Sequence, residues 1–260
     1  MKLSIITVCK NTDKVIEKTI ISVIKQTFID YEYIVIDGAS SDGTLDLINK
    51  YSTDINKLIS EPDKGIYDAM NKGIEQSTGE YLMFLNAGDY FVNSDVLQKV
   101  FKLNFYEDIV YGDTLILHRS KFIRKPASSR ITKFFMFFDT IPHQNVFIRK
   151  SVFEKAGMHD VNYRIAGDYD FFLRAIFKYG IKTQYFGFPV TVNNLEGVSA
   201  DRKNKKITYD ERRIAQNKWF NKNISFCFRL LKPFVYVFHK YPKYIINIFC
   251  SLTCKNYLRI

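Results

Sequence analysis

Over the first 85 residues, apolar runs of strand length alternate with segments whose apolar residues recur at helical spacing. Residues 3–9 form one such run, and Ile16, Ile20, Val23 and Ile24 follow at helical spacing. A regular alternation of this kind is typical of a mainly parallel sheet covered by helices. It predicts strands at 3–9, 32–37, 58–59 and 81–85, and helices at 14–26, 43–48 and 66–76. The sequence therefore predicts an α/β fold with a mainly parallel sheet flanked by helices.

The alternation becomes less regular after residue 85. Weaker patterns predict a strand at 109–111, a hairpin at 114–124, a strand at 145–148 and a helix at 168–177. No low-complexity linker or repeat separates these segments from the first part of the chain. We therefore predict one domain over residues 1–200, with halves at 1–112 and 113–200, and a C-terminal extension at 201–260.

Charge is divided unevenly along the chain. Residues 1–201 carry 24 Lys and Arg against 25 Asp and Glu, a net charge of −1, whereas residues 202–260 carry 14 against 2, a net charge of +12. This division excludes a nucleic-acid-binding protein that is basic over its whole surface. The C-terminal extension therefore needs a partner of its own.

The C-terminal extension has the pattern of a basic amphipathic helix. A helical projection separates two sets of residues, the apolar Ile224, Phe228, Leu231, Val235 and Phe238 and the basic Lys222, Arg229, Lys232, Lys240 and Lys243. Pro233 and Pro242 are expected to divide it into short helices. Such a segment is expected to bind an anionic membrane surface. The alternative is that its apolar side packs on the domain while its charges are solvated.

The sequence shows no recognisable export signal, and its cysteines do not indicate an exported protein. The N-terminal apolar run is too short for a signal peptide, and no stretch of about 18 apolar residues predicts a transmembrane helix. The cysteines, Cys9, Cys227, Cys250 and Cys254, match no disulfide or zinc framework. We therefore expect a cytoplasmic protein that is peripheral on the cytoplasmic face of the inner membrane.

Two predicted strands end in acidic residues. Asp37 closes the second strand, and Asp89 follows the fourth. A single Asp at such a position is more often a helix cap, but two at neighbouring strand ends indicate a ligand site, because ligands bind beyond the carboxyl ends of parallel strands. No glycine-rich phosphate loop follows the first strand. Mg²⁺ or Mn²⁺ held by Asp89 and by a ligand's phosphates is therefore the expected cofactor.

Five segments occur in an order that resembles family 2 glycosyltransferases: SIITVCKN, EYIVIDGASSDGT, EPDKGIYDAMNKGI, TGEYLMFLNAGDYF and IAGDYDFFLR. The resemblance covers roughly residues 3–200. It implies the Rossmann-like GT-A fold and an inverting enzyme that uses a nucleotide-sugar. The chain is most similar to bacterial enzymes that build exopolysaccharide, capsule, O-antigen or colanic-acid-type units.

The resemblance assigns roles to individual residues. Thr7 and Asp37 match nucleotide-binding positions, and Asp168 matches the general base that removes the proton of the attacking hydroxyl. The acidic metal motif of the family falls on residues 86–89, where only Asp89 is acidic and Asn86 replaces an acid. From the sequence alone, Asp168 is equally well explained as a helix cap. Asp170 is better explained as a first-turn acid that the helix dipole favours.

Seven further residues are weaker candidates. Asp63 and Lys64 match a family loop near the nucleotide, although a plain turn explains them equally well, and Asp68 and Asn71 face either the pocket or solvent. The other candidates are Asp113, which lines the sugar site or ends a strand, and, for the acceptor side, His143 and Gln144.

The function that these residues predict is transfer of a sugar from a nucleotide-sugar, with UDP favoured, to a lipid-linked oligosaccharide or another glycan acceptor in surface polysaccharide synthesis. One alternative is a non-catalytic nucleotide-sugar-binding protein of the same fold, suggested by the missing acids at Asn86 and Gly88. A less favoured alternative is a sugar nucleotidyltransferase, which should carry a glycine-rich loop after the first strand. Nucleic acid is not an expected partner.

Overall fold

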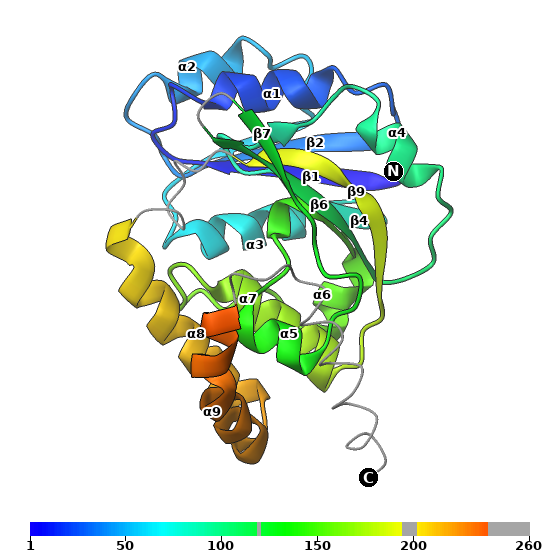
Figure 1. Ribbon diagram of the computed structural model, residues 1–260. Helices are drawn as coiled ribbons and strands as arrows, with labels where there is room; N and C mark the ends of the chain where they lie inside the picture. The colour runs from blue at the N-terminus through cyan, green and yellow to red at the C-terminus, as the bar shows by residue number, and fades with distance from the viewer. Residues whose placement is uncertain (119–120, 194–201, 239–260) are drawn as a thin grey trace.

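The computed structural model describes residues 1–118, 121–193 and 202–238. Its first part follows the predicted alternation of strands and helices (Figure 1). The elements are β1 (Leu3–Cys9), α1 (Ile16–Ile24), β2 (Tyr31–Asp37), α2 (Thr44–Asn49), β3 (Lys57–Ser60), α3 (Ile66–Gln76) and β4 (Tyr81–Phe84). The predicted strands and helices of this part are confirmed to within a few residues.

The second part of the chain contains more structure than its sequence pattern predicts. Its elements are β5 (Tyr90–Phe91), α4 (Val96–Phe101), β6 (Ile109–His118), β7 (Lys121–Lys125), α5 (Lys133–Phe138), η1 (His143–Asn145), β8 (Val146–Arg149), α6 (Lys150–Ala156), α7 (Gly167–Leu173), η2 (Arg174–Lys178) and β9 (Thr183–Asn193). The hairpin predicted at 114–124 is formed by β6 and β7. The long strand β9 was not predicted.

All of these strands belong to one mixed sheet, in the order β3-β2-β1-β4-β8-β6-β9-β5, with β7 beside β6. The first four strands in this order are parallel, and β8 joins β4 in the antiparallel direction. The predicted division between residues 112 and 113 falls inside β6, which continues without a break. The two predicted halves therefore share a single sheet.

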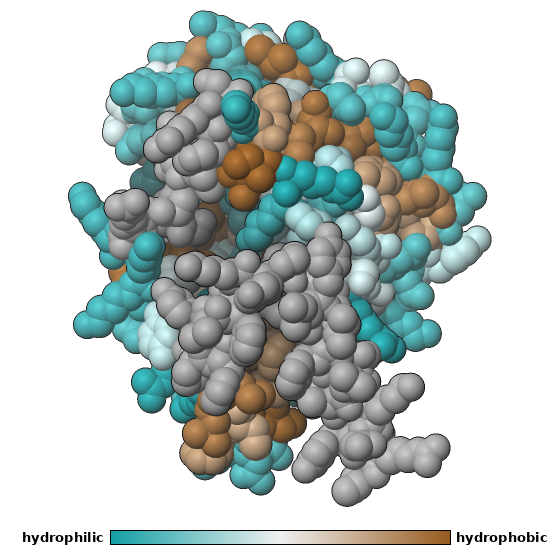
Figure 2. Space-filling view, in the orientation of Figure 1, coloured by the Kyte–Doolittle hydropathy of each residue, from teal (hydrophilic) through white to brown (hydrophobic). Residues whose placement is uncertain are grey.

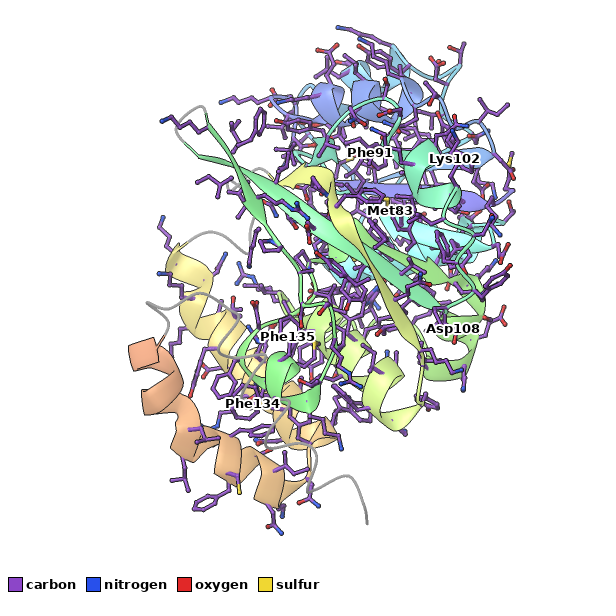
Figure 3. The ribbon with its side chains drawn as sticks, turned by 45° about the vertical axis from the view of Figure 1, so that its right-hand side comes forward. Met83, Phe91, Lys102, Asp108, Phe134 and Phe135 are labelled. Atoms are coloured by element: carbon purple, nitrogen blue, oxygen red, sulfur yellow. The ribbon has the colours of Figure 1, made fainter. Side chains whose placement is uncertain are left out.

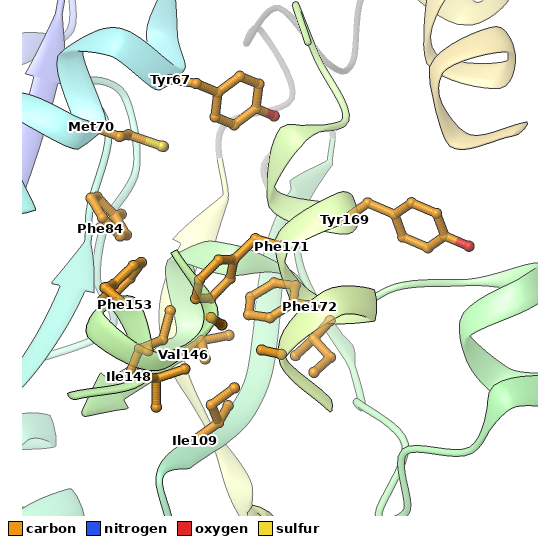
Figure 4. Packing of buried hydrophobic residues seen from close by; sticks show 14 of the residues in the cluster. Tyr67, Met70, Phe84, Ile109, Val146, Ile148, Phe153, Tyr169, Phe171 and Phe172 are labelled. Carbon is orange, nitrogen blue, oxygen red and sulfur yellow. The ribbon is translucent and has the colours of Figure 1, made fainter. Parts of the chain in front are cut away.

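Side chains of the central strands alternate between two hydrophobic layers. Ile6 of β1 faces a layer shared with α3 and α7, whereas Ile5 faces a layer shared with α1 and α4. Figure 3 labels Met83 and Phe91 in the second layer, and Figure 4 shows residues of the first, including Phe84. Helices on both faces therefore leave the carboxyl ends of the parallel strands as the available edge for a site.

Two further helices, α8 (Lys205–Trp219) and α9 (Lys222–Phe238), follow the sheet and lie beside α5 and α7 (Figure 1). Gln216 of α8 is buried and donates hydrogen bonds to the carbonyl of Phe137 and to the hydroxyl of Tyr169, each at 3.0 Å. Phe228 of α9 packs against Phe137, with ring centroids 5.3 Å apart. Helix α8 is therefore packed onto the domain, although its sequence belongs to the predicted extension.

The prediction that Pro233 ends a short helix is wrong, because α9 runs from residue 222 to residue 238. A proline removes a single backbone donor, and the helix continues beyond it. The predictions for Lys240, Pro242 and Lys243 lie outside the described residues. None of the helices in the described ranges combines the length and the apolar character needed to cross a membrane.

Candidate active site

Four elements meet beyond the carboxyl ends of β2 and β4. Asp37 ends β2, and the turn with Asp89 follows β4. The short helix η1 brings His143 next to β4, since η1 leads into β8 and β8 pairs with β4. Asp168 lies in the first turn of α7. The edge predicted from the sequence therefore collects residues from both predicted halves of the chain.

A continuous series of polar side chains crosses this site. Asn86 Nδ2 lies 3.1 Å from His143 Nε2, and His143 Nδ1 lies 3.2 Å from Asp168 Oδ2. The other oxygen of Asp168 accepts hydrogen bonds from the Tyr67 hydroxyl at 3.3 Å and from the backbone N–H of Tyr169 at 2.8 Å. The N-cap of α7 is Ala166, which makes no side-chain cap bond, and Asp168 lies inside the helix. The alternative prediction that Asp168 is the helix cap is therefore wrong. The Asp168 carboxylate is instead oriented by its neighbours.

His143 and Asp168 shift each other's proton affinity. Burial alone would raise the pKa of Asp168, but the hydrogen bond and charge of His143 outweigh burial, so the pKa is lowered. Burial alone would lower the pKa of His143, but Asp168 and the more distant charge of Asp89 raise it. Asp168 is therefore ionised at neutral pH, as a proton acceptor must be before the reaction.

The stability of the folded chain is expected to depend on pH through this pair. Because the folded-state pKa of His143 is raised, its contribution is full below pH ~6.5 and is lost as the pH rises through the folded-state pKa. Chemical denaturation at several pH values should show wild type losing its stability advantage over His143→Gln as the pH rises above about 6.5. A constant or growing advantage over this range would contradict the pairing.

The turn after β4 is held rigidly by α1. The hydroxyl of Thr19 donates to the carbonyl of Asp89 at 2.8 Å and accepts from the N–H of Gly88 at 2.9 Å. Gly88 has φ of 99°, a left-handed conformation that a glycine adopts without strain. The turn therefore presents residues 86–89 in a fixed arrangement at the strand end.

The donor atoms of this turn fit a hard divalent cation. Asp89 supplies a carboxylate, and Asn86 Oδ1 is a buried oxygen without a hydrogen-bond partner among the described residues. Within residues 1–118, 121–193 and 202–238, no three His, Cys, Asp or Glu side chains form a group that could hold a metal ion. A cation in this turn would therefore take most of its ligands from phosphate oxygens and water, as Mg²⁺ commonly does.

The other predicted nucleotide-binding segments lie together at the end of β2. The Asp37 carboxylate is fully buried and accepts hydrogen bonds from the backbone and hydroxyl of Ser40 and from the hydroxyl of Ser60, at 2.5 to 3.0 Å. Asp63 lies against Gly38, where a Cβ would come within 2.0 Å of Asp63 Oδ2. Asp63 also accepts from the N–H of Gly65 at 2.9 Å. Asp37 therefore fixes the loop that follows β2.

The remaining candidates in this region make local contacts. Lys64 is exposed, and its backbone N–H donates to Asp68 at 3.0 Å. Asn71 exchanges two hydrogen bonds, at 2.9 and 3.0 Å, with the backbone of His159. His159 is buried among aromatic rings, and burial lowers its pKa to about 4. Asn71 thus holds a buried neutral histidine in place.

Three predicted residues are enclosed by the fold. Thr7, which matches a nucleotide-binding position of the family, is fully buried, and its hydroxyl donates to the carbonyl of Leu85 at 2.7 Å. Asp113 is also fully buried, with hydrogen bonds from Arg124, Tyr185 and the N–H of Ala127 at 2.6 to 2.8 Å. Gln144 is buried beside His143.

Sequence reasoning missed two residues that support the site. Tyr67 lies on α3 and contacts Asp168, although its helical spacing indicates only a core position. Glu211 lies on α8 and accepts hydrogen bonds from the backbone just before α7. Neither contact has a signal in the sequence, because each joins residues far apart along the chain.

Comparisons with known proteins agree with this geometry. The family model for Glycosyl transferase family 2 matches residues 4–170. The PGL/p-HBAD biosynthesis glycosyltransferase of Mycobacterium tuberculosis is 32% identical over 203 residues, which are 75% of this chain and 78% of that protein. The poly(ribitol-phosphate) beta-N-acetylglucosaminyltransferase TarS of Staphylococcus aureus is 31% identical over 103 residues, which are 38% of this chain and 18% of that protein.

Solved structures share the fold. TarS 1-349 of S. aureus in complex with UDP-GlcNAc has a TM-score of 0.67 at 17% identity and covers 94% of this chain and 74% of its own. The mannosyltransferase PcManGT of Pyrobaculum calidifontis, in complex with GDP-Man and Mn²⁺, has a TM-score of 0.58 at 17% identity. The match covers 76% of this chain and 58% of PcManGT. The predicted GT-A fold is therefore confirmed.

The family match covers more than half of the chain and includes the strand-end residues described above. It confirms the predicted class of enzyme, in preference to the sugar nucleotidyltransferase alternative. The chain therefore belongs to glycosyl transferase family 2 and is a glycosyltransferase with the GT-A fold.

Proposed function

We propose that this glycosyltransferase moves a sugar from a UDP-sugar to a hydroxyl group of a lipid-linked glycan, with inversion at the anomeric carbon. One observation carries the proposal: an ionised Asp168, oriented by His143 and Tyr67, belongs to the same polar series as Asn86 of the turn that carries Asp89. This arrangement supports the proposal that a proton acceptor and a phosphate-binding turn act together at one edge of the sheet.

In the proposed reaction, the acceptor hydroxyl attacks the anomeric carbon from the face opposite the leaving nucleoside diphosphate. The hydroxyl loses its proton to Asp168 as the new glycosidic bond forms and the bond to the diphosphate breaks. His143 holds the carboxylate in position through its Nδ1 and stabilises its charge. Asp168 therefore takes up the proton without moving.

The donor is proposed to bind across the ends of β2 and β4. The carboxylate of Asp89 and the side-chain oxygen Oδ1 of Asn86 would hold Mg²⁺ or Mn²⁺. The bound cation would neutralise the negative charge on the diphosphate. Asp37 fixes the loop after β2, where the nucleoside is expected to lie. UDP is the preferred nucleotide, because the similar TarS structures are complexes with UDP and UDP-GlcNAc.

Thermal unfolding with a panel of nucleotide-sugars tests this donor. A ligand that binds the folded chain stabilises it by about 2.7 kcal/mol at 100 times its Kd, which for a chain of this size raises the Tm by roughly 5 to 10 °C. We expect UDP-sugars with Mn²⁺ to give this shift, and GDP-sugars or Mn²⁺ alone to give less. Equal shifts for all nucleotides would contradict the UDP assignment.

The acceptor is proposed to carry a lipid with an anionic head group. A cavity of about 330 Å³ lies between α5, α8 and α9 and is lined by Lys205, Arg212, Arg213 and Arg229 together with aromatic rings. No acidic residue lines this cavity within the described part of the chain. Apolar side chains of α9, including Phe226 and Leu230, are exposed nearby, and Figure 2 shows hydrophobic surface at this end of the molecule. Basic and apolar groups together suit a peripheral contact with an anionic membrane.

Vesicle binding tests this surface. Replacing Lys205 and Arg213 by Gln should weaken binding to anionic vesicles about tenfold or more, since each basic residue near the membrane surface contributes about 1 kcal/mol. The matched control is Lys25→Gln with Lys50→Gln, which removes the same charge from the exposed residues that directly follow α1 and α2. If both double variants lose binding equally, net charge explains the attraction and the cavity does not.

A further inference from the structure

A carboxylate from outside the matched family region holds the chain just before α7. Glu211 on α8 accepts three backbone hydrogen bonds from consecutive residues: from Arg164 at 2.7 Å, from Ile165 at 2.9 Å and from Ala166 at 2.8 Å. The family match ends at residue 170, so Glu211 lies 41 residues beyond it. A charged acceptor that receives three amide donors makes strong, directional contacts. Glu211 therefore fixes this stretch of backbone.

Tyr67 of α3 holds the opposite side of the same stretch. Its hydroxyl donates to the carbonyl of Ile165 at 2.5 Å, and a Cβ at Gly167 would come within 2.8 Å of its ring. Figure 4 shows Tyr67 pointing from α3 toward the start of α7. Residues 164–167, which comprise the last three residues before α7 and its first residue, are therefore clamped between α3 and α8 and are named the pre-α7 segment.

The pre-α7 segment determines where Asp168 lies. Asp168 follows it directly, and the Tyr67 hydroxyl that bonds Ile165 is also 3.3 Å from Asp168 Oδ1. Ala166, the residue before α7, has no side chain that could cap the helix. A shift of this segment would therefore change the contacts of Asp168 with His143 and Tyr67 together.

We propose that Glu211 is a positioning residue for the reaction at Asp168. Its carboxylate acts through the pre-α7 segment, without touching substrate, and keeps Asp168 at hydrogen-bond distance from His143. Helix α8 is then part of the catalytic unit. The inference rests on the proposed role of Asp168 as the base.

Kinetics of Glu211 variants test this role. Glu211→Gln keeps the side-chain length and one acceptor oxygen, whereas Glu211→Ala keeps neither. A displacement of about 1 Å costs up to 10²-fold in rate, so we expect kcat to fall about tenfold in Glu211→Gln and up to 10²-fold in Glu211→Ala, with an unchanged KM for the donor. Measured well below the Tm of each variant, where the chains are folded, this loss of kcat is a result that general destabilisation does not give.

Two variants of the same helix serve as controls. Asp210→Asn removes one negative charge from the exposed neighbouring position and should keep wild-type kcat. Trp219→Phe removes another bond between α8 and α7, from Trp219 Nε1 to Asp170 at 2.7 Å. It should lower thermal stability while keeping kcat within a few-fold of wild type. A fall in kcat in Trp219→Phe as large as in Glu211→Gln would overturn the proposal.

Hydrogen–deuterium exchange gives a readout that does not depend on activity. The amides of residues 164–166 should exchange faster in Glu211→Gln than in wild type, Asp210→Asn or Asp168→Asn. Slow exchange together with kcat within twofold of wild type in Glu211→Gln would overturn the proposal. If instead Asp168→Asn retains full activity, the proposed base is wrong, and the exchange data still report whether Glu211 holds the segment.

Discussion

Replacing Asp168 by Asn is expected to lower kcat by about 10² to 10⁴-fold while the affinity for the nucleotide-sugar stays close to wild type. Asn has nearly the same shape and still accepts hydrogen bonds from Tyr67 and from the backbone of residue 169, so the fold should persist. It cannot take up the proton of the acceptor hydroxyl. The rate of sugar transfer at saturating donor, together with the Kd for the donor, measures the effect.

Asp170 provides the matched control for this experiment. It lies on the same helix and is fully buried, but its carboxylate accepts bonds from Tyr163 and Trp219 and has no contact with His143 among the described residues. Asp170→Asn should therefore lower thermal stability while kcat stays close to that of wild type. An Asp168→Asn enzyme with near-normal transfer, or one that unfolds as readily as Asp170→Asn, would return Asp168 to a purely structural role.

Replacing Asp89 by Asn should have the second largest effect, a loss of metal-dependent turnover of about 10²-fold or more. The described residues contain no group of three or more His, Cys, Asp or Glu side chains that could hold the ion in its place. Asn keeps the size of the side chain, and the turn is fixed through backbone contacts of Thr19, so the fold should be retained. Titration of activity with Mn²⁺ measures the change.

The control for Asp89 is Asp95→Asn, which removes one carboxylate from an exposed ion pair with Lys99 and should leave the Mn²⁺ dependence unchanged. The stabilisation that a UDP-sugar gives in thermal unfolding should become independent of Mn²⁺ in Asp89→Asn only. If Asp89→Asn keeps the wild-type Mn²⁺ dependence, the metal lies elsewhere in the chain.

The sequence was sufficient to predict the strands in the first half of the sheet, because these strands are buried and apolar and are separated by helices of regular period. It was insufficient for β9. Gly187 and Pro189 interrupt this strand, and its pairing with β6 shifts register near Asp113. Glycine and proline inside a strand argue against assigning one from sequence. Tertiary pairing with β6 and β5 overrides that local signal.

The sequence predicted the acidic residues of the site but not the contacts between the side chains of the site. Asp168 and His143 were separate candidates, and the sequence did not indicate that they form a pair. Thr7 was predicted from the family resemblance and Asp113 from its place after a strand, yet the polar atoms of both make hydrogen bonds inside the fold. Strand ends can be located from periodicity, but the direction of a side chain there depends on loops that the pattern does not specify.

The anomeric configuration of the product tests the central claim most directly. In ¹H NMR, the sugar transferred from an α-linked UDP-sugar, or released to water in the first minutes of slow hydrolysis, should have the β configuration. A single displacement assisted by Asp168 produces this inversion. The same experiment with Asp168→Asn should show little product in the same time. A product with the α configuration would contradict the account, because retention requires a different chemistry from the one proposed for Asp168.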